Sequence, residues 1–267
     1  TLIRMKPLFF AISLASLLLQ ACVSDQNPFN RGTWIDLTHD FDEDAIYWPT
    51  AESYRFDTVF EGMTEKGYYY SSFKFSAEEH GGTHMDAPRH FSEGKNPIHE
   101  IPIGQMMGPA VVIDISHKAE ADRNYQVSVE DFLEWERKHG RIPEKAMIML
   151  NTGSAKYWPD REKYMGTAER GPEAIAKLQF PGLHPDAATW LAENRSINLI
   201  GLDTPSIDHG PSVYFEAHRN LFEHKILVVE NVTNLDLLPA SGAWIIALPM
   251  KIKHGSGAPA RIIAWIK

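Results

Sequence analysis

Short apolar runs rich in β-branched residues recur from residue 110 onward, separated by polar and turn-forming residues. Runs of about four to eight residues with this composition favour strands over helices, which are usually longer. Earlier in the chain, residues 68–75 alternate in character, with Tyr69, Ser71, Phe73 and Phe75 on one side, and predict a further strand. The other predicted strands are residues 110–115, 147–150, 197–202, 226–229, 243–248 and 260–266.

Two helices are predicted between these runs. Ser128 can cap the first, which carries Phe132 and Trp135 on its apolar side and ends at Gly140. The second begins near Pro185 and leads into a predicted strand. Such helix-to-strand units are typical of crossovers between parallel strands, whereas the end of the chain contains strands joined only by turns. The sequence therefore predicts a single α/β domain whose mixed β-sheet is flanked by helices.

The composition is that of an ordinary globular protein. The 267 residues are 43% hydrophobic and 23% charged, which is enough apolar material for a substantial core, so we expect one catalytic domain. The formal net charge is -9, and no cluster of lysine and arginine stands out. A protein that binds a nucleic-acid backbone needs such a basic surface, so no nucleic-acid binding is expected.

The first 22 residues have the layout of a signal peptide. Arg4 and Lys6 precede the apolar run 7–19, and a small residue, Ala21, stands near the end of the segment. The apolar run is shorter than the roughly 20 residues that a membrane span needs. We therefore expect residues 1–22 to direct export of the protein.

Cys22 is the only cysteine, so no disulfide can form within one chain. Its place at the end of Leu19-Gln20-Ala21-Cys22 resembles the lipobox of bacterial lipoproteins, whose cysteine becomes lipidated; the alternative is an ordinary cleavage site with an incidental cysteine. We expect an exported protein of the bacterial cell envelope that faces the periplasm and contacts the membrane only through a lipid anchor at Cys22. A polar linker at residues 23–32 then leads to a domain at residues 33–267.

The densest group of metal-capable side chains lies in the segment His80-Gly-Gly-Thr-His84-Met-Asp86-Ala-Pro-Arg-His90-Phe91. The two consecutive glycines oppose a helix there, each by roughly 1 kcal/mol. In an extended segment His84 and Asp86 share a face because side chains alternate, and the flexible glycines allow His80 to turn towards the same point. The segment therefore predicts a metal site formed by His80, His84 and Asp86.

Two imidazoles and one carboxylate suit Zn, Mn or Fe(II) and leave positions open for water and substrate. A metal in such a site lowers the pKa of bound water towards about 7 and polarises a carbonyl oxygen, which favours hydrolysis. Because the chain has twelve histidines, any single pair is more simply explained as surface or core residues. The glycines and the acid make the whole cluster a stronger indication of a catalytic metal site.

The same segment closely resembles the signature His-x-Gly-Thr-His-x-Asp-x-Pro-x-His-Phe of the cyclase-like metal-dependent hydrolases, the group that contains kynurenine formamidase and isatin hydrolase. The resemblance covers residues 33–267 and implies a cyclase-like fold of the swivelling β/α/β type. Further segments that resemble the family, in order, are Asp36-Leu37-Thr38-His39, Asn151-Thr152-Gly153, Phe180-Pro181-Gly182, residues 201–208 and residues 255–261.

The resemblance assigns the three residues of the predicted site to a first divalent ion, Mn or Zn. In the formamidase branch, a histidine and a glutamate twelve residues apart complete a second position, and His218 and Glu230 have that spacing. Asp86 would then bridge to a second ion held by His90, His218 and Glu230. In the isatin hydrolase branch one ion is bound. His90 and His218 then contact the ligands of that ion rather than the ion itself, or transfer protons. One or two ions per chain are therefore expected, and Glu230 favours two.

The function that the resemblance implies is hydrolysis of a carbon–nitrogen amide bond in a small molecule, either a linear formamide or a cyclic amide such as isatin, with His90 and His218 as catalytic residues. Trp48 offers an aromatic surface for a planar substrate, and Ser206 follows a strand end, where site residues are common. The alternatives are a non-catalytic envelope lipoprotein that binds metal or ligand, and a cyclase or lactonase acting on a different small molecule. The family also implies a homo-oligomer, a dimer or tetramer.

Overall fold

The computed structural model describes residues 31–267, and the predicted signal peptide with Cys22 lies outside this range. Within the described range, no helix is long and apolar enough to cross a membrane. The strands are β1 Thr33–Asp36, β2 Arg55–Met63, β3 Tyr69–Ser76, β4 His84–Asp86, β5 Met107–Asp114, β6 Gln126–Val127, β7 Ala146–Asn151, β8 Gly182–Leu183, β9 Ile197–Leu202, β10 Leu227–Glu230, β11 Ser241–Pro249 and β12 Gly257–Ile266. The helices are α1 Ser116–Ala121, α2 Val129–His139, α3 Arg161–Met165, α4 Pro172–Ile175, α5 Pro185–Asn194 and α6 Glu216–Glu223.

Seven of the strands close into a barrel in the order β12-β11-β5-β7-β9-β10-β4. The ring is complete because β4 pairs with both β10 and β12, and β1 is added alongside β12. Strands β5, β7, β9 and β10 run parallel to one another, whereas β4 and β11 pair antiparallel with their neighbours. The prediction of a single mixed α/β domain is confirmed. Closure of the sheet into a barrel, which removes its free edges, goes beyond that prediction.

The apolar runs predicted as strands form the barrel wall, and their alternate residues face two different cores. In β7, Met147 and Met149 join a cluster to which all seven strands contribute and which therefore fills the barrel, while Ile148 and Leu150 join a second cluster outside it. Because the parallel strands are buried on both faces, nearly every position must be apolar. This explains the uninterrupted runs in the sequence.

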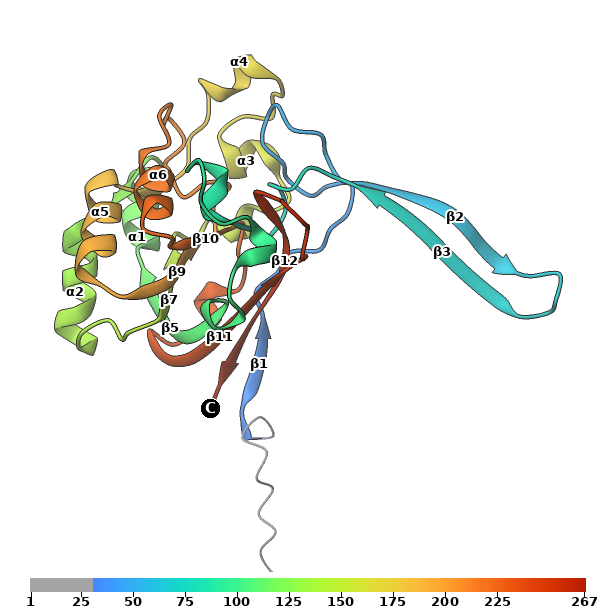
Figure 1. The fold of residues 1–267 in the computed structure, drawn as a ribbon. Helices are drawn as coiled ribbons and strands as arrows, with labels where there is room; N and C mark the ends of the chain where they lie inside the picture. Colours follow the sequence, from blue (N-terminus) through green and yellow to red (C-terminus); the bar gives the residue numbers. More distant parts are fainter. Residues whose placement is uncertain (1–30) are drawn as a thin grey trace, which may run out of the picture.

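Helices α2, α5 and α6 contribute to the outer cluster and lie together on one side of the barrel (Figure 1). Phe132 of α2, Leu191 of α5 and Phe222 of α6 are fully buried there. As predicted, α2 begins directly after Ser128, whose backbone N–H donates to the Asp131 carboxylate at 2.7 Å and so satisfies one group at the helix start. This packing fixes α6, which carries His218, against the barrel wall.

The hairpin of β2 and β3 projects from the barrel as an arm, residues 55–76 (Figure 1). Its two strands pair with each other and with no other described strand. The strand predicted at residues 68–75 is β3, and its partner β2 has no comparable signal in the hydrophobic pattern. The arm joins the body close to the metal-binding segment, which follows β3 in the chain.

Candidate metal centre

Strand β4 and the glycine turn before it bring the first predicted ligands together. His84 and Asp86 occupy the two ends of β4 and share one face of it. Gly82 has a left-handed φ of 58°, and a Cβ on Gly81 would lie 2.0 Å from the Tyr47 ring, so both positions require glycine. The segment is a turn that enters a strand, as the sequence predicts, rather than a helix.

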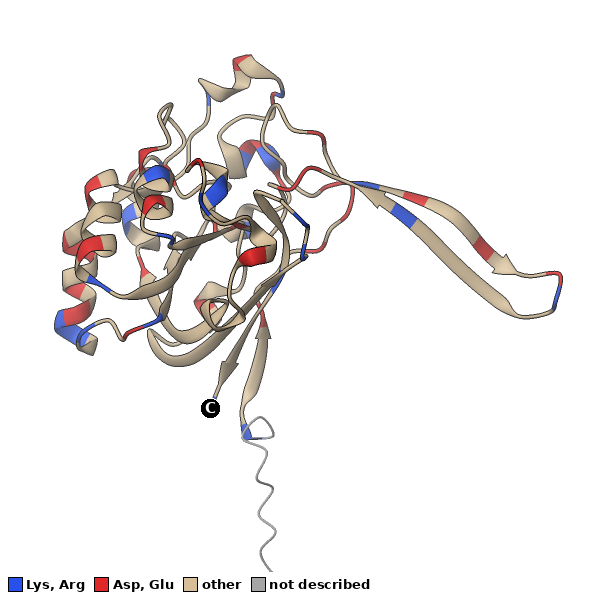
Figure 2. Ribbon diagram, viewed as in Figure 1, with Lys and Arg blue, Asp and Glu red and all other residues tan. Residues whose placement is uncertain are grey.

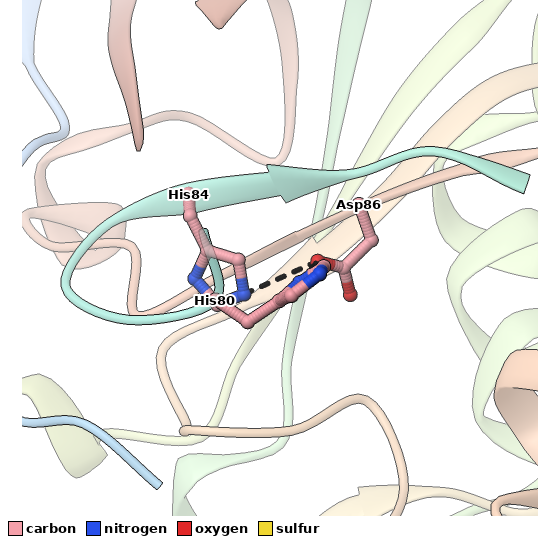
Figure 3. Close-up of side chains that lie close together, drawn as sticks. All are labelled: His80, His84 and Asp86. Atoms are coloured by element: carbon pink, nitrogen blue, oxygen red, sulfur yellow. Dashed lines mark hydrogen bonds and ion pairs between the residues drawn. The ribbon is translucent and has the colours of Figure 1, made fainter. Parts of the chain in front are cut away.

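The side chains of His80, His84 and Asp86 form a first set of ligand atoms that all lie within 4.8 Å of one another. His80 Nδ1 lies 2.6 Å and His84 Nε2 3.2 Å from Asp86 Oδ1, and Figure 3 shows both rings next to that carboxylate. With Nδ1 protonated, His84 donates to the Gly82 carbonyl at 3.0 Å, which makes Nε2 the nitrogen with the free lone pair.

The surroundings of this nitrogen indicate whether the residues fit a metal ion. His84 Nε2 is buried and makes no hydrogen bond of good geometry, although it faces carboxylate oxygens of Asp86 at 3.2 Å and Glu230 at 3.5 Å. A buried polar atom without a hydrogen bond costs free energy. A cation in contact with that nitrogen removes the cost. The donor set of two imidazoles and a carboxylate is also one that divalent transition metals bind well. The residues of the first set therefore fit a divalent metal ion.

A second set of ligand atoms consists of Asp86, His218 and Glu230, all of them buried. His218 Nε2 lies 3.3 Å from Asp86 Oδ2 and 3.1 Å from Glu230 Oε1. The two oxygens of Asp86 are thus divided: Oδ1 faces the histidines of the turn and of β4, and Oδ2 faces α6. If two ions were bound, Asp86 would be a ligand of both, one through each oxygen.

Burial and charge shift the pKa values of this cluster in opposite directions. Burial alone would lower the pKa of His84, but Asp86 and Glu230 raise it to about 9. Burial would also lower the pKa of His218, yet its hydrogen bonds to Asp208, Asp86 and Glu230 hold it well above the usual value. The carboxylates therefore keep cationic imidazoles beside them in the metal-free protein. A divalent ion supplies the same positive charge when it displaces those protons.

Each of two ligand histidines is oriented through its other ring nitrogen. His218 Nδ1 donates to Asp208 Oδ2 at 2.7 Å, and this leaves Nε2 directed at Asp86. His80 Nε2 lies 2.8 Å from Ser256 Oγ, which donates to Glu79 Oε2 at 2.7 Å. Such partners fix the tautomer and orientation of a metal-binding histidine.

His90 lies in the short 3-10 turn Pro88–His90 and stacks on His80, with ring centroids 3.7 Å apart. It belongs to neither set of ligand atoms, and the second set is complete without it. Burial lowers its pKa to about 3, partly offset by Asp86, so the ring is neutral near pH 7. A neutral imidazole keeps one ring nitrogen free to accept a hydrogen bond from water or substrate.

Residues of both sets line a cavity of about 230 Å³, together with apolar and aromatic residues such as Ile46, Trp48 and Phe91. Trp48 and Ser206, the predicted substrate-binding residues, both line it, as does His90. Phe215 completes an aromatic wall: its ring centroid is 6.2 Å from Trp48 and 5.1 Å from Phe91. The cavity wall contains no lysine or arginine. It therefore suits a small, planar and largely apolar molecule.

Some of these residues are not identified by the sequence pattern. Asp208 stands out only as part of a loop after a predicted strand, and Phe215 only as a neighbour of His218. Glu79 precedes the metal-binding segment directly, and Ser256 lies between two glycines near the end of the chain. Glu79 can be suggested from the sequence because it is adjacent to His80. Ser256 cannot, because it comes close to the site only when β12 pairs with β4 in the folded barrel.

The chain is similar to a family of known proteins. Residues 35–209 match the family model described as putative cyclase. The chain is 31% identical to isatin hydrolase from Roseibium aggregatum, over 70% of this chain and 72% of that protein, and 30% identical to kynurenine formamidase from Bacillus cereus, over 86% of this chain and 96% of that protein. The solved structure of isatin hydrolase A from Labrenzia aggregata bound to benzyl benzoate is 30% identical, covers 95% of this chain and 99% of its own, and has a TM-score of 0.80. The chain therefore belongs to the putative cyclase family, whose members with this fold include isatin hydrolases.

Proposed function

We propose that the protein is a metal-dependent amidohydrolase that cleaves a carbon–nitrogen bond in a small aromatic amide, linear or cyclic. The observation that carries the proposal is that Asp86 belongs to two sets of metal ligands, and that both sets line a cavity with aromatic walls. The complete second set with His218 and Glu230 favours two divalent ions, and its nitrogen and oxygen donors suit Mn or Zn.

A bound divalent ion lowers the pKa of a water molecule and polarises the carbonyl oxygen of an amide. The chain's own residues supply the remaining requirements. His90 stacks on His80 and lines the cavity, so its ring is placed to relay a proton from the attacking water to the leaving nitrogen. Trp48 and Phe215 hold a planar ring, and their apolar surfaces exclude bulk water from the reacting atoms.

The substrate class follows from the cavity and from the names of the relatives. One relative hydrolyses isatin, a cyclic amide, and another is a kynurenine formamidase, which acts on a linear formamide. The predicted export signal and lipid anchor at Cys22 favour an envelope enzyme that meets incoming small molecules. This location favours isatin, another lactam or imide, or a lactone over a formamide from kynurenine breakdown.

The test is hydrolysis by the purified protein, stripped of metal and reloaded with Mn or Zn. Isatin and N-formylkynurenine are supplied as substrates, and ring opening or deformylation is followed by ultraviolet absorbance. We expect saturable, metal-dependent turnover of at least one substrate, lost by roughly 100-fold or more in His90→Gln and retained in the control His117→Ala, whose exposed ring lies outside the cavity wall. Tight metal binding without turnover of either substrate would overturn the proposal in favour of a binding protein.

A further inference from the structure

Asn231 directly follows the ligand Glu230 at the end of β10 and is almost fully buried. Its φ of 53° lies in the left-handed region, which asparagine adopts more readily than most residues. Its backbone N–H donates to the Thr204 carbonyl at 3.0 Å, and its carbonyl accepts from the Thr83 hydroxyl at 2.6 Å. The backbone of Asn231 is therefore fixed between the loop after β9 and the turn before β4.

The side-chain amide of Asn231 has a defined orientation. Its Nδ2 lies 2.7 Å from the Gly82 carbonyl oxygen, and because a carbonyl can only accept, the amide nitrogen must face it. Oδ1 then faces the hydroxyl of Tyr164, which donates to it at 2.9 Å and lies 3.1 Å from a second acceptor, the Asp203 carbonyl oxygen. Burial raises the pKa of Tyr164 well above its usual value, so this hydroxyl keeps its proton. Tyr164 therefore holds the amide in the orientation that faces the glycine turn.

The Gly82 carbonyl connects Asn231 to the first set of ligands. It accepts from Asn231 Nδ2 and, at 3.0 Å, from His84 Nδ1, so both of its lone pairs are used. Gly82 has no side chain to anchor this peptide group, and glycine is the residue whose backbone angles change most freely. The contact with Asn231 therefore fixes the carbonyl that determines the tautomer of His84.

Neutral groups provide this support. The strands β7 and β9 contain no charged residue and are tan in Figure 2. An amide and a phenol hold the turn without adding a charge beside the ligand carboxylates. A further negative group there would repel those carboxylates, and a positive one would compete with the metal ion.

Asn231 also lines the cavity, so a direct contact with substrate is the competing role. Both the oxygen and the nitrogen of its amide are already hydrogen-bonded within the protein, which favours a positioning role. We propose that the amide of Asn231, held by Tyr164, positions His84 for the first metal ion. It acts through the Gly82 carbonyl, and this role rests on the metal-dependent function proposed above. Two consecutive residues then serve both sets, since Glu230 is a ligand in the second and Asn231 supports the first.

Metal affinities of single and double variants test the proposal. Asn231→Gly removes the amide and tolerates the left-handed backbone, and Tyr164→Phe removes only the hydroxyl. We expect each to weaken zinc binding at the first ion by about 10-fold, with a change of less than about 3-fold at the second, in competition with a chromophoric chelator. The double variant should bind no more weakly than Asn231→Gly, because Tyr164 acts through the amide. The matched control is Tyr125→Phe, which removes a hydroxyl that donates to Asp131 at 2.9 Å near the start of α2 and leaves both affinities unchanged.

The histidine rings supply a readout that a general loss of stability does not change. Long-range nitrogen–proton NMR of the zinc-loaded, nitrogen-15-labelled protein identifies which ring nitrogens carry a proton and which bind the ion. We expect the His84 signals to shift in Asn231→Gly and in Tyr164→Phe, while the signals of His218 stay as in the parent.

Three results would overturn the positioning role. They are unchanged His84 signals in the folded single variants, equal losses of affinity at both ions, and a double variant that binds the first ion more weakly than Asn231→Gly. Tight zinc binding by a parent that hydrolyses no amide would instead refute the proposed function alone.

Discussion

Replacing Asp208 by asparagine tests how His218 is oriented, because it changes the hydrogen-bond partner of His218 while His218 itself is kept. Burial alone would raise the pKa of Asp208, but the hydrogen bond and charge of His218 lower it, so the group is an ionised carboxylate at neutral pH. It accepts from His218 Nδ1 at 2.7 Å and from the backbone N–H of Ala217 at 3.0 Å. An asparagine keeps the shape and one acceptor. It removes the charge, and its amide N–H₂, if turned towards Nδ1, favours the tautomer whose Nε2 is protonated and cannot bind metal.

The expected loss follows from the strength of such contacts. Outer partners of metal-binding histidines typically contribute 10- to 100-fold in affinity, which corresponds to about 1.4–2.7 kcal/mol. We expect this loss at the second ion in Asp208→Asn, with a change of less than about 3-fold at the first ion, because the first set contains no partner of Asp208. Competition with a chromophoric chelator at fixed pH measures both affinities.

The exposed Asp186→Asn, in the first turn of α5, serves as the matched control. Thermal unfolding of the metal-free proteins establishes whether the fold of each variant is intact. Unchanged affinity at both ions in a folded Asp208→Asn protein would refute the orienting role. Equal losses at both ions would refute it too, since they would indicate a general disturbance of the site.

Three further predictions concern the turn, a helix start and the cavity. Gly81→Ala places a Cβ 2.0 Å from the Tyr47 ring, and we expect urea unfolding to show a loss of about 1–3 kcal/mol; unchanged stability would mean that the turn relaxes freely. Asp131→Asn should cost about 1 kcal/mol at pH 7. Although burial opposes it, hydrogen bonds lower the pKa of Asp131 below its unfolded value, so its stabilisation is present above about pH 4 and is lost as the pH falls through the folded pKa; a difference between parent and variant that widens in acid would contradict this. Trp48→Ala should raise KM about 10-fold in steady-state kinetics with little change in kcat, and the opposite pattern would exclude simple stacking.

The sequence predicts those parts of the fold that depend only on residues close together in the chain. Met147 to Leu150 form an unbroken apolar run because the strand is buried on both faces, and this is visible without any tertiary contact. The first ligand set is also local, since the glycine turn and the two-residue alternation act within seven consecutive residues. Both features follow from backbone geometry alone.

The remaining features depend on contacts between distant segments. Strand β4 has only three residues, of which Met85 alone is apolar, so no hydrophobic pattern reveals it, yet it closes the barrel and carries two ligands. His218 is 132 positions from Asp86, and Ser256 is 176 positions from His80. Only the family resemblance suggested His218, through its spacing to Glu230. Nothing in the local pattern indicated Ser256, because its role exists only after β12 pairs with β4.

The most direct test of the two-ion centre is the number of metal ions per chain, measured by elemental mass spectrometry after loading and removal of excess metal. Glu230→Gln is the informative variant, since it keeps the shape of the side chain while it removes the charge from the second set. We predict two ions per chain in the parent, one in Glu230→Gln, and a loss of the first ion in His84→Ala. A parent that retains no ion, or a Glu230→Gln protein that still holds two, would contradict the centre described for Asp86.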